Sequence, residues 1–390
     1  MTDIVEDMHR TISTLAPPVG KARIGPTTGI SGLVYRSVRG ITRAVGVGLD
    51  ASLSRLAPLL DRQSLPPVAR EAALSALNGV LGDYLHASSN SLAIAMSWRR
   101  DGRALRLHAA DRSSSVEATL ASTDSNSADS DSVAPTATAS PSKLLLMVHG
   151  LCMNDRQWSR AGHDHGAALA ALGYTPIYLR YNSGLKVATN GRQLAAAIDA
   201  LLAQWPQPVD EIVLLGHSMG GLVARSAIHY GGMASHGWLR KLKTLICLGA
   251  PHLGSPLERA GNKVDMLLGF SPYSAPFARL GMIRSAGIQD LRHGRVIDDE
   301  QDAATVAMLP DHLAVYLLAA SKQAADDTGK RPSGDGLVPI DSALGLHPDP
   351  LRALRVPTSN RATVYAHDHF DLLSSAEVAG HLQRWLSSRG

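Results

Sequence analysis

Residues 211–226 read EIVLLGHSMGGLVARS. An apolar run is followed by GHSMG at 216–220 and then by a segment compatible with a helix. This order predicts a strand, a sharp turn and a helix, with Ser218 at the apex of the turn. Gly216 and Gly220 lie two positions to either side of the serine, where such a turn leaves room only for small residues. The helix that follows would direct its N-terminal N–H groups toward the same point.

A phosphate-binding loop is the main alternative for a glycine-rich turn between a strand and a helix. Such a loop would require a Lys-Ser or Lys-Thr pair after the glycines. The sequence instead continues with Gly221-Leu222-Val223. The turn therefore favours a serine nucleophile.

The composition is that of a globular protein. The 390 residues suffice for one α/β domain with appendages or for two domains, and 45% are hydrophobic and 18% charged. A net charge of +4, without a basic run, does not indicate nucleic-acid binding. The two cysteines, Cys152 and Cys247, form neither a disulfide framework nor a metal-binding set.

Targeting signals are not evident. The first residues, MTDIVEDMHR, lack the charged-then-apolar pattern of a secretory signal. No apolar stretch approaches the roughly 18–20 residues that a membrane span requires. We therefore expect a cytoplasmic protein, with peripheral membrane contact as an open alternative.

The N-terminal part, residues 1–88, is expected to be a loose arm followed by a helical extension. Helical periodicity runs from 30 to 60, and a second helix follows Pro66-Pro67. We expect the two helices to pack on the main domain. An amphipathic membrane-surface anchor formed by residues 30–87 is the alternative.

Residues 89–390 are expected to form an α/β domain. Two alternating runs joined through Asp101-Gly102 predict a β-hairpin, and the Ser/Thr/Ala/Asp-rich segment 111–142 predicts a disordered loop. Strand–helix alternation follows, which is typical of a mostly parallel sheet wrapped by helices. Strands are predicted at 144–148, 176–181, 212–216, 244–248, 315–319 and 362–365, and helices at 157–172, 191–204, 219–230 and 376–387. Asn190 and Gln193 form a plausible capping pair for the second of these helices.

The segment 254–300 departs from this alternation and is rich in Met, Leu and Phe. At that place in the chain it would lie above Ser218, as a lid or an acyl pocket. Its candidate pocket residues are Leu267, Leu268, Phe270 and Phe277. The alternative is a helical excursion with no role in binding.

A serine nucleophile needs a histidine base and a group that orients the histidine. The acid candidate is Asp335 in GDGLVP, with Asp341 as its nearest competitor. The base candidate is His369 in AHDHFDLL, with His367 as the alternative. The HxH pair lacks a third ligand motif, so the sequence predicts no metal site.

The oxyanion would be bound by backbone N–H groups. The turn after the first core strand contains Gly150, which permits a sharp bend, and the N–H of Leu151 would act together with that of Met219. In this interpretation His149 is structural. Cys152 lies nearby, but no motif places a histidine beside its thiol.

From about Leu144 onward the chain resembles α/β-hydrolase-fold lipases and esterases, especially the triacylglycerol-lipase and PGAP1-like groups. The matching motifs are VHGLCMNDRQW, RYNSGL, GHSMGG, GAPHLGSPLE, GDGLVP and HFDLL. The order Ser218, Asp335, His369 is also that of the α/β-hydrolases. The resemblance implies Ser218 as nucleophile, Asp335 as acid, His369 rather than His367 as base, and an oxyanion hole from the Leu151 and Met219 backbone. PGAP1-like enzymes that deacylate glycolipid anchors span the membrane, so that substrate is not expected here.

The sequence therefore predicts a serine esterase or lipase of the α/β-hydrolase fold. It would hydrolyse a small-molecule or lipid ester through an acyl-enzyme, without a cofactor or metal. An acyltransferase or thioesterase with the same triad is one alternative. A membrane-peripheral binding protein with a vestigial triad is the other.

Overall fold

The computed structural model describes residues 67–105, 132–133, 142–255, 285–298, 307, 309–325 and 333–387. The helical pattern at 30–60 and most of the segment 111–142 lie outside these ranges. So do the four candidate pocket residues Leu267, Leu268, Phe270 and Phe277.

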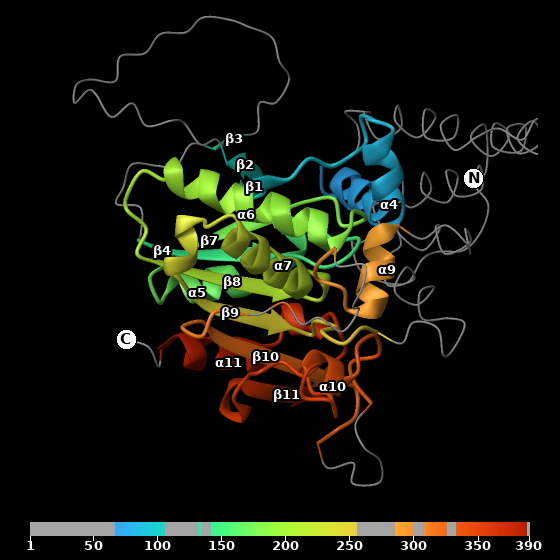
Figure 1. Cartoon of the computed structure of the whole chain (residues 1–390), viewed down its shortest axis with the longest axis vertical. Coiled ribbons are helices and arrows are strands. Elements are labelled where there is room, and N and C mark those ends of the chain that lie inside the picture. Colours follow the sequence, from blue (N-terminus) through green and yellow to red (C-terminus); the bar gives the residue numbers. More distant parts are fainter. Residues whose placement is uncertain are drawn as a thin grey trace, which may run out of the picture.

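Nine strands of the described chain form one central sheet (Figure 1). Their order is β11-β10-β9-β8-β4-β7-β1-β2-β3. β1 pairs antiparallel with β7 and β2, whereas the other neighbouring pairs are parallel. The strands are β1 (Ser97–Arg100), β2 (Arg103–Leu105), β3 (Ser132–Val133), β4 (Lys143–Val148), β7 (Tyr174–Arg180), β8 (Glu211–His217), β9 (Leu242–Leu248), β10 (Ala314–Ser321) and β11 (Arg361–Tyr365).

The middle strands are apolar throughout because helices cover both faces of the sheet. Every residue of β10 is buried, as are all but the first residue of β4 and of β8. The six strands predicted between 144 and 365 form with bounds shifted by at most two residues. The predicted hairpin also forms, as β1 and β2, and both turn residues, Asp101 and Gly102, have positive φ.

Helices α6 and α7 pack together on one face of the sheet, while α5 and α11 lie on the other (Figure 1). The α6–α7 contact is close, because a Cβ atom on Gly191 would overlap Ser226. This arrangement confirms the predicted α/β-hydrolase fold class. The helices are α4 (Pro67–Ala87), α5 (His165–Ala170), α6 (Val187–Ala203), α7 (Met219–Met233), α9 (Ala286–His293), α10 (Ile340–Ala343) and α11 (Ala376–Ser387), with 3₁₀ turns η1 (Asp155–Trp158), η2 (Gly237–Arg240), η4 (Thr358–Asn360) and η5 (Asp371–Leu373).

The helix predicted at 157–172 is wrong in its first half. The chain there forms η1, then a small antiparallel hairpin of β5 (Ser159–Arg160) and β6 (His163–Asp164), and only then α5. Ala161 and Gly162 at the hairpin turn both have positive φ, which interrupts any continuous helix. Helical periodicity in the sequence did not reveal this turn.

The predicted capping pair of α6 is also wrong. The helix begins at Val187, so Asn190 lies inside its first turn rather than before it. Asn190 is buried, and its Nδ2 atom donates to the carbonyl oxygen of Asn182 at 3.0 Å. This side chain therefore holds the preceding loop instead of capping the helix.

Helix α4 forms where the sequence predicted a helix after Pro66-Pro67, and it packs deeply on the domain. Glu71 of α4 pairs with Arg99 of β1, with Arg156 of η1 and with Arg180 of β7. Asn78 bonds the backbone of Leu92 and of Ile94 in the segment that leads to β1. With 21 residues α4 is the longest described helix, and none of the described helices has the length and apolar content that a membrane crossing needs.

Candidate active site

Ser218 lies at the turn between β8 and α7, as the sequence predicted. Its φ of 54° and ψ of −125° are values that a residue with a side chain rarely adopts, so the backbone is strained there. The N–H of Ser218 donates to the carbonyl oxygen of Leu248, the last residue of β9, at 2.8 Å. The serine is held at the carboxyl ends of two neighbouring strands, where sites in α/β sheets gather.

The two glycines beside the serine have no room for a side chain. A Cβ atom on Gly216 would lie 2.5 Å from the backbone nitrogen of Gly221. A Cβ atom on Gly220 would overlap the carbonyl oxygen of Val148 at the end of β4. The close approach expected from the sequence is therefore present on both sides of the turn.

The loop after β4 lies against the same turn. A Cβ atom on Gly150 would lie 3.1 Å from the Cβ atom of Ser218. Leu151 follows directly, and Met219 is the first residue of α7, so its N–H has no carbonyl one turn earlier in the helix to bond. Met219 therefore adjoins Ser218 in the chain, and Leu151 adjoins the glycine that packs against it.

Asp335 and His369 form a buried hydrogen-bonded pair. The Nδ1 atom of His369 lies 2.7 Å from Oδ2 of Asp335, and each residue is 1% exposed. The other carboxylate oxygen, Oδ1, accepts from the N–H groups of Leu337 and Val338 at 2.8 and 2.7 Å. The backbone N–H of His369 also donates to the carbonyl oxygen of Asp335 at 3.2 Å. This acid therefore fixes both the backbone and the ring of the histidine.

Gly249 connects the pair to the serine turn. A Cβ atom on Gly249 would lie 3.3 Å from Oδ2 of Asp335 and 3.3 Å from Cε1 of His369. The preceding residue, Leu248, accepts the N–H of Ser218. The Nε2 atom of His369 is buried and has no hydrogen-bond partner among the described residues. One ring nitrogen of His369, Nδ1, is thus bonded to Asp335. The other, Nε2, has no partner among the described residues.

The two competing residues, His367 and Asp341, are not the ones joined in this pair. The Nδ1 atom of His367 bonds the carbonyl oxygen of Tyr365, and its Nε2 atom lies 2.7 Å from the hydroxyl of Ser375. Asp341 belongs to helix α10, and it is Asp335 that contacts His369. The geometry favours Asp335 and His369 in both comparisons.

Three buried histidines surround the site, and burial keeps them neutral. Desolvation lowers the pKa of His149 to about 3 and that of His165 to about 4. Desolvation and the neighbouring His369 hold the pKa of His217 well below its usual range. His149 stacks on Tyr181 with ring centroids 4.4 Å apart, which agrees with the structural role expected for it.

Two of these histidines, His165 and His217, are not among the site residues predicted from the sequence. The Nε2 atom of His165 lies 2.9 Å from the carbonyl oxygen of Leu372, and Nε2 of His217 lies 3.0 Å from that of His369. Both histidines therefore hold the segment that carries the candidate base. The motif GHSMG contained a signal for His217, because it precedes Ser218, whereas no motif pointed to His165.

The thiol of Cys152 is buried beside this loop. Desolvation raises its pKa to about 12, so the reactive thiolate is disfavoured. The backbone of Cys152 has a positive φ of 59°, and its N–H donates to the hydroxyl of Ser183 at 3.0 Å. Cys152 shapes the loop and does not offer a nucleophile.

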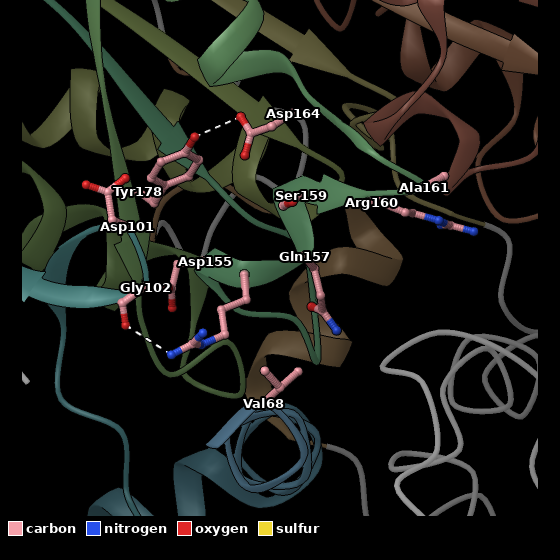
Figure 2. Close-up of a pocket in the computed structure, with 11 residues that line it drawn as sticks. Val68, Asp101, Gly102, Asp155, Gln157, Ser159, Arg160, Ala161, Asp164 and Tyr178 are labelled. Atoms are coloured by element: carbon pink, nitrogen blue, oxygen red, sulfur yellow. Dashed lines mark hydrogen bonds between the residues drawn. The ribbon is translucent and has the colours of Figure 1, made fainter. Parts of the chain in front are cut away.

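A cavity of about 670 Å³ lies beside this site, between the start of α4, the β1–β2 turn, η1 and the β5–β6 hairpin (Figure 2). Its wall includes Asp101, Asp155 and Asp164, and the hydroxyl of Tyr178 donates to Asp164 at 2.8 Å. Ser218, Asp335 and His369 do not line it. It approaches them through Arg160, whose guanidinium lies 5.6 Å from the ring centroid of Phe370, the residue after His369.

No group of three or more His, Cys, Asp or Glu side chains in the described part of the chain is placed to hold a metal ion. The two histidines of the HxH pair have different partners. His367 bonds the carbonyl oxygen of Tyr365, and His369 bonds Asp335. Beside Ser218, the described residues provide an imidazole oriented by Asp335 and the backbone N–H at the start of α7.

Comparisons with known proteins agree with this architecture. Residues 143–322, somewhat less than half of the chain, match the family model described as PGAP1-like alpha/beta domain. No curated protein matches the sequence. The match begins at the first residue of β4 and ends just after β10, so it contains Ser218 but neither Asp335, His369 nor α4.

Several solved structures are similar to the chain at low sequence identity. The mature form of the Bacillus licheniformis lipase BlEst2 is 18% identical with a TM-score of 0.41, covering 64% of this chain and 93% of the lipase. A lipase-esterase related protein from Clostridium acetobutylicum is 15% identical, with a TM-score of 0.37 and coverages of 63% and 94%. An esterase from Pyrococcus furiosus is 16% identical, with a TM-score of 0.39 and coverages of 64% and 81%.

Proposed function

We propose, from the premise that residues 143–322 form a PGAP1-like alpha/beta domain within an α/β-hydrolase fold, that the protein is a serine hydrolase of carboxylic esters. Ser218 is the nucleophile, His369 the general base and Asp335 the residue that orients the base. The backbone N–H groups of Leu151 and Met219 bind the oxyanion.

The observation that carries the proposal is the Asp335–His369 pair. A carboxylate that accepts the Nδ1–H of an imidazole leaves Nε2 as the basic nitrogen. Here that nitrogen is buried without a partner among the described residues, next to the turn that presents Ser218. The pair therefore supports His369 as the base, because its Nε2 atom is not used by another described residue.

The chemistry proceeds in two halves. The hydroxyl oxygen of Ser218 attacks the ester carbonyl while Nε2 of His369 takes the hydroxyl proton, and the imidazolium then gives that proton to the departing alkoxide. Water repeats the sequence on the acyl-enzyme and releases the acid. Asp335 stabilises the imidazolium in both halves. A substrate oxyanion next to Leu151 and Met219 gains backbone donors in a buried site.

Hydrolysis of p-nitrophenyl esters from acetate to palmitate tests the proposal. We expect Ser218→Ala and His369→Ala each to lower kcat/KM by about 10³-fold or more. His367→Ala is the matched control, because it removes a histidine two positions away in the same loop that bonds Tyr365 and Ser375 instead. This control should keep most of the wild-type activity.

The outcomes separate the components of the proposal. Undiminished activity in Ser218→Ala would refute the assigned nucleophile. An equal loss in His367→Ala and His369→Ala would withdraw the assignment of the base. Product analysis with added alcohols divides hydrolysis from acyl transfer, and the chain-length optimum divides small esters from lipids.

A further inference from the structure

We propose that His217 is a positioning residue that fixes the base His369 against the Ser218 turn, an inference that rests on the function proposed above. His217 is the last residue of β8 and immediately precedes Ser218. Its side chain is fully buried, and its Nε2 atom lies 3.0 Å from the backbone carbonyl oxygen of His369. The two residues are 152 positions apart in the chain.

The direction of this hydrogen bond follows from its partners. A carbonyl oxygen only accepts, so Nε2 of His217 carries the proton and donates it. The rings of His217 and His369 lie close to each other, with centroids 4.7 Å apart. The remaining nitrogen, Nδ1, has no hydrogen-bond partner among the described residues and lies toward Gly150. Among the described residues, the side chain of His217 thus forms one hydrogen bond, to the carbonyl oxygen of His369.

Each polar group of His369 other than Nε2 has a partner. The backbone N–H and Nδ1 both bond Asp335, and the backbone carbonyl oxygen accepts from His217. The first two bonds fix the histidine to the loop after β10. Of these three bonds, only the third connects His369 to β8, and it comes from the residue directly before the nucleophile Ser218.

Loss of this donor would act on geometry. The carbonyl oxygen of His369 would be left buried without a partner, and the peptide would reorient to find one. Because the ring of His369 belongs to the same residue, Nε2 would move relative to the hydroxyl of Ser218. A displacement of about 1 Å between reacting groups is enough to lower a rate about 100-fold. Because the change acts on the position of the base, it should lower kcat and leave KM nearly unchanged.

Three variants of His217 separate positioning from packing. His217→Leu removes the donor at similar volume. His217→Gln places an amide nitrogen where Nε2 stands, whereas His217→Asn reaches only as far as Nδ1. We expect the Leu and Asn variants to lose about 10- to 100-fold in kcat with KM changed by less than about threefold. The Gln variant should recover most of that loss.

The measurements are kcat and KM on the best p-nitrophenyl ester, the labelling rate of Ser218 by a fluorophosphonate, and the thermal unfolding of each variant. Wild-type kcat in His217→Leu, or equal losses in the Gln and Asn variants, would overturn the inference while wild-type turnover still supports the proposed function. If His217→Leu does not fold, the Gln and Asn pair decides. A wild type that neither turns over esters nor reacts with the fluorophosphonate would overturn both proposals.

Discussion

Gly79 of α4 lies directly against Cys152 in the loop after β4. A Cβ atom on Gly79 would overlap the Sγ atom of Cys152 and lie 2.9 Å from its Cα atom. The thiol also lies 3.8 Å from the carbonyl oxygen of Ala76, one turn earlier in α4. Cys152 follows Leu151, one of the two residues proposed to bind the oxyanion. A helix outside the matched family domain therefore supports the backbone of the proposed site.

Substitution of Gly79 should disturb that support. We expect Gly79→Ala to lower the free energy of unfolding by about 1–3 kcal/mol, because the added methyl group meets backbone as well as a side chain. Helix propensity alone predicts the opposite, a gain of up to about 1 kcal/mol. Gly232→Ala in α7 is the matched control, since its Cβ atom would meet only Leu239, at 3.9 Å.

Urea denaturation of both glycine variants measures these changes. The control should stay within about 1 kcal/mol of the wild type, and Gly79→Ala should also lose ester hydrolysis. A Gly79→Ala protein as stable and active as the control would show that α4 can move away from the loop at no cost.

The strained backbone of Ser218 should lower the free energy of unfolding, and a glycine at this position should relieve that strain. A strained residue of this kind costs about 1–3 kcal/mol. Glycine adopts positive φ easily, at an entropic cost of about 0.5–1 kcal/mol. We therefore expect Ser218→Gly to be more stable than Ser218→Ala by about 1–2 kcal/mol. Both variants lack the hydroxyl and should be inactive, so they differ only in the Cβ atom and the strain at this position.

Equilibrium unfolding in urea compares the two serine variants directly. Alanine keeps the Cβ atom and therefore the strain, so it is the reference for the loss of the hydroxyl alone. A Ser218→Ala protein at least as stable as Ser218→Gly would mean that the turn is not strained in solution.

The buried histidines predict acid sensitivity below pH 6.5. Their pKa is lowered in the folded state, to about 3 for His149 and about 4 for His165. In the unfolded chain the same groups titrate near 6.5, so the unfolded state binds more protons as the pH falls. The free energy of unfolding should then decrease by roughly 1.4 kcal/mol per pH unit for each such histidine. Asp155 and Asp290, whose pKa values burial raises, act in the opposite direction at lower pH.

Urea unfolding at pH 7, 6 and 5 measures this dependence. His165→Asn cannot be protonated, so its stability should change less with pH than that of the wild type. A stability that is constant or rises between pH 6.5 and 5 would contradict the assignment of neutral, buried histidines.

The fold was largely predictable because its signals are local. Short apolar runs marked the central strands, and glycines marked the turn at Ser218. The failures were local structures that depend on their surroundings. The hairpin at 159–164 is contacted by β7 through the bond from Tyr178 to Asp164, and Asn190 near the start of α6 bonds Asn182 in the preceding loop.

The candidate site was predictable as a set of residue types in order along the chain. The sequence left Asp341 and His367 as competitors, since spacing alone does not tell two nearby acids or two nearby histidines apart. The structure distinguishes them by their partners, because Asp335 contacts His369 whereas His367 bonds Tyr365 and Ser375.

The sequence by itself determined the strand–turn–helix at 211–226, the parallel sheet and the serine at its edge, because backbone sterics and hydrophobic periodicity act over neighbouring residues. Only the tertiary structure decided which histidine faces which acid, how deeply α4 is buried, and that His217 holds His369. These relations join β8 to the loops after β10 and β11. They arise when strands distant in the sequence become neighbours, and no local pattern encodes the distance between them.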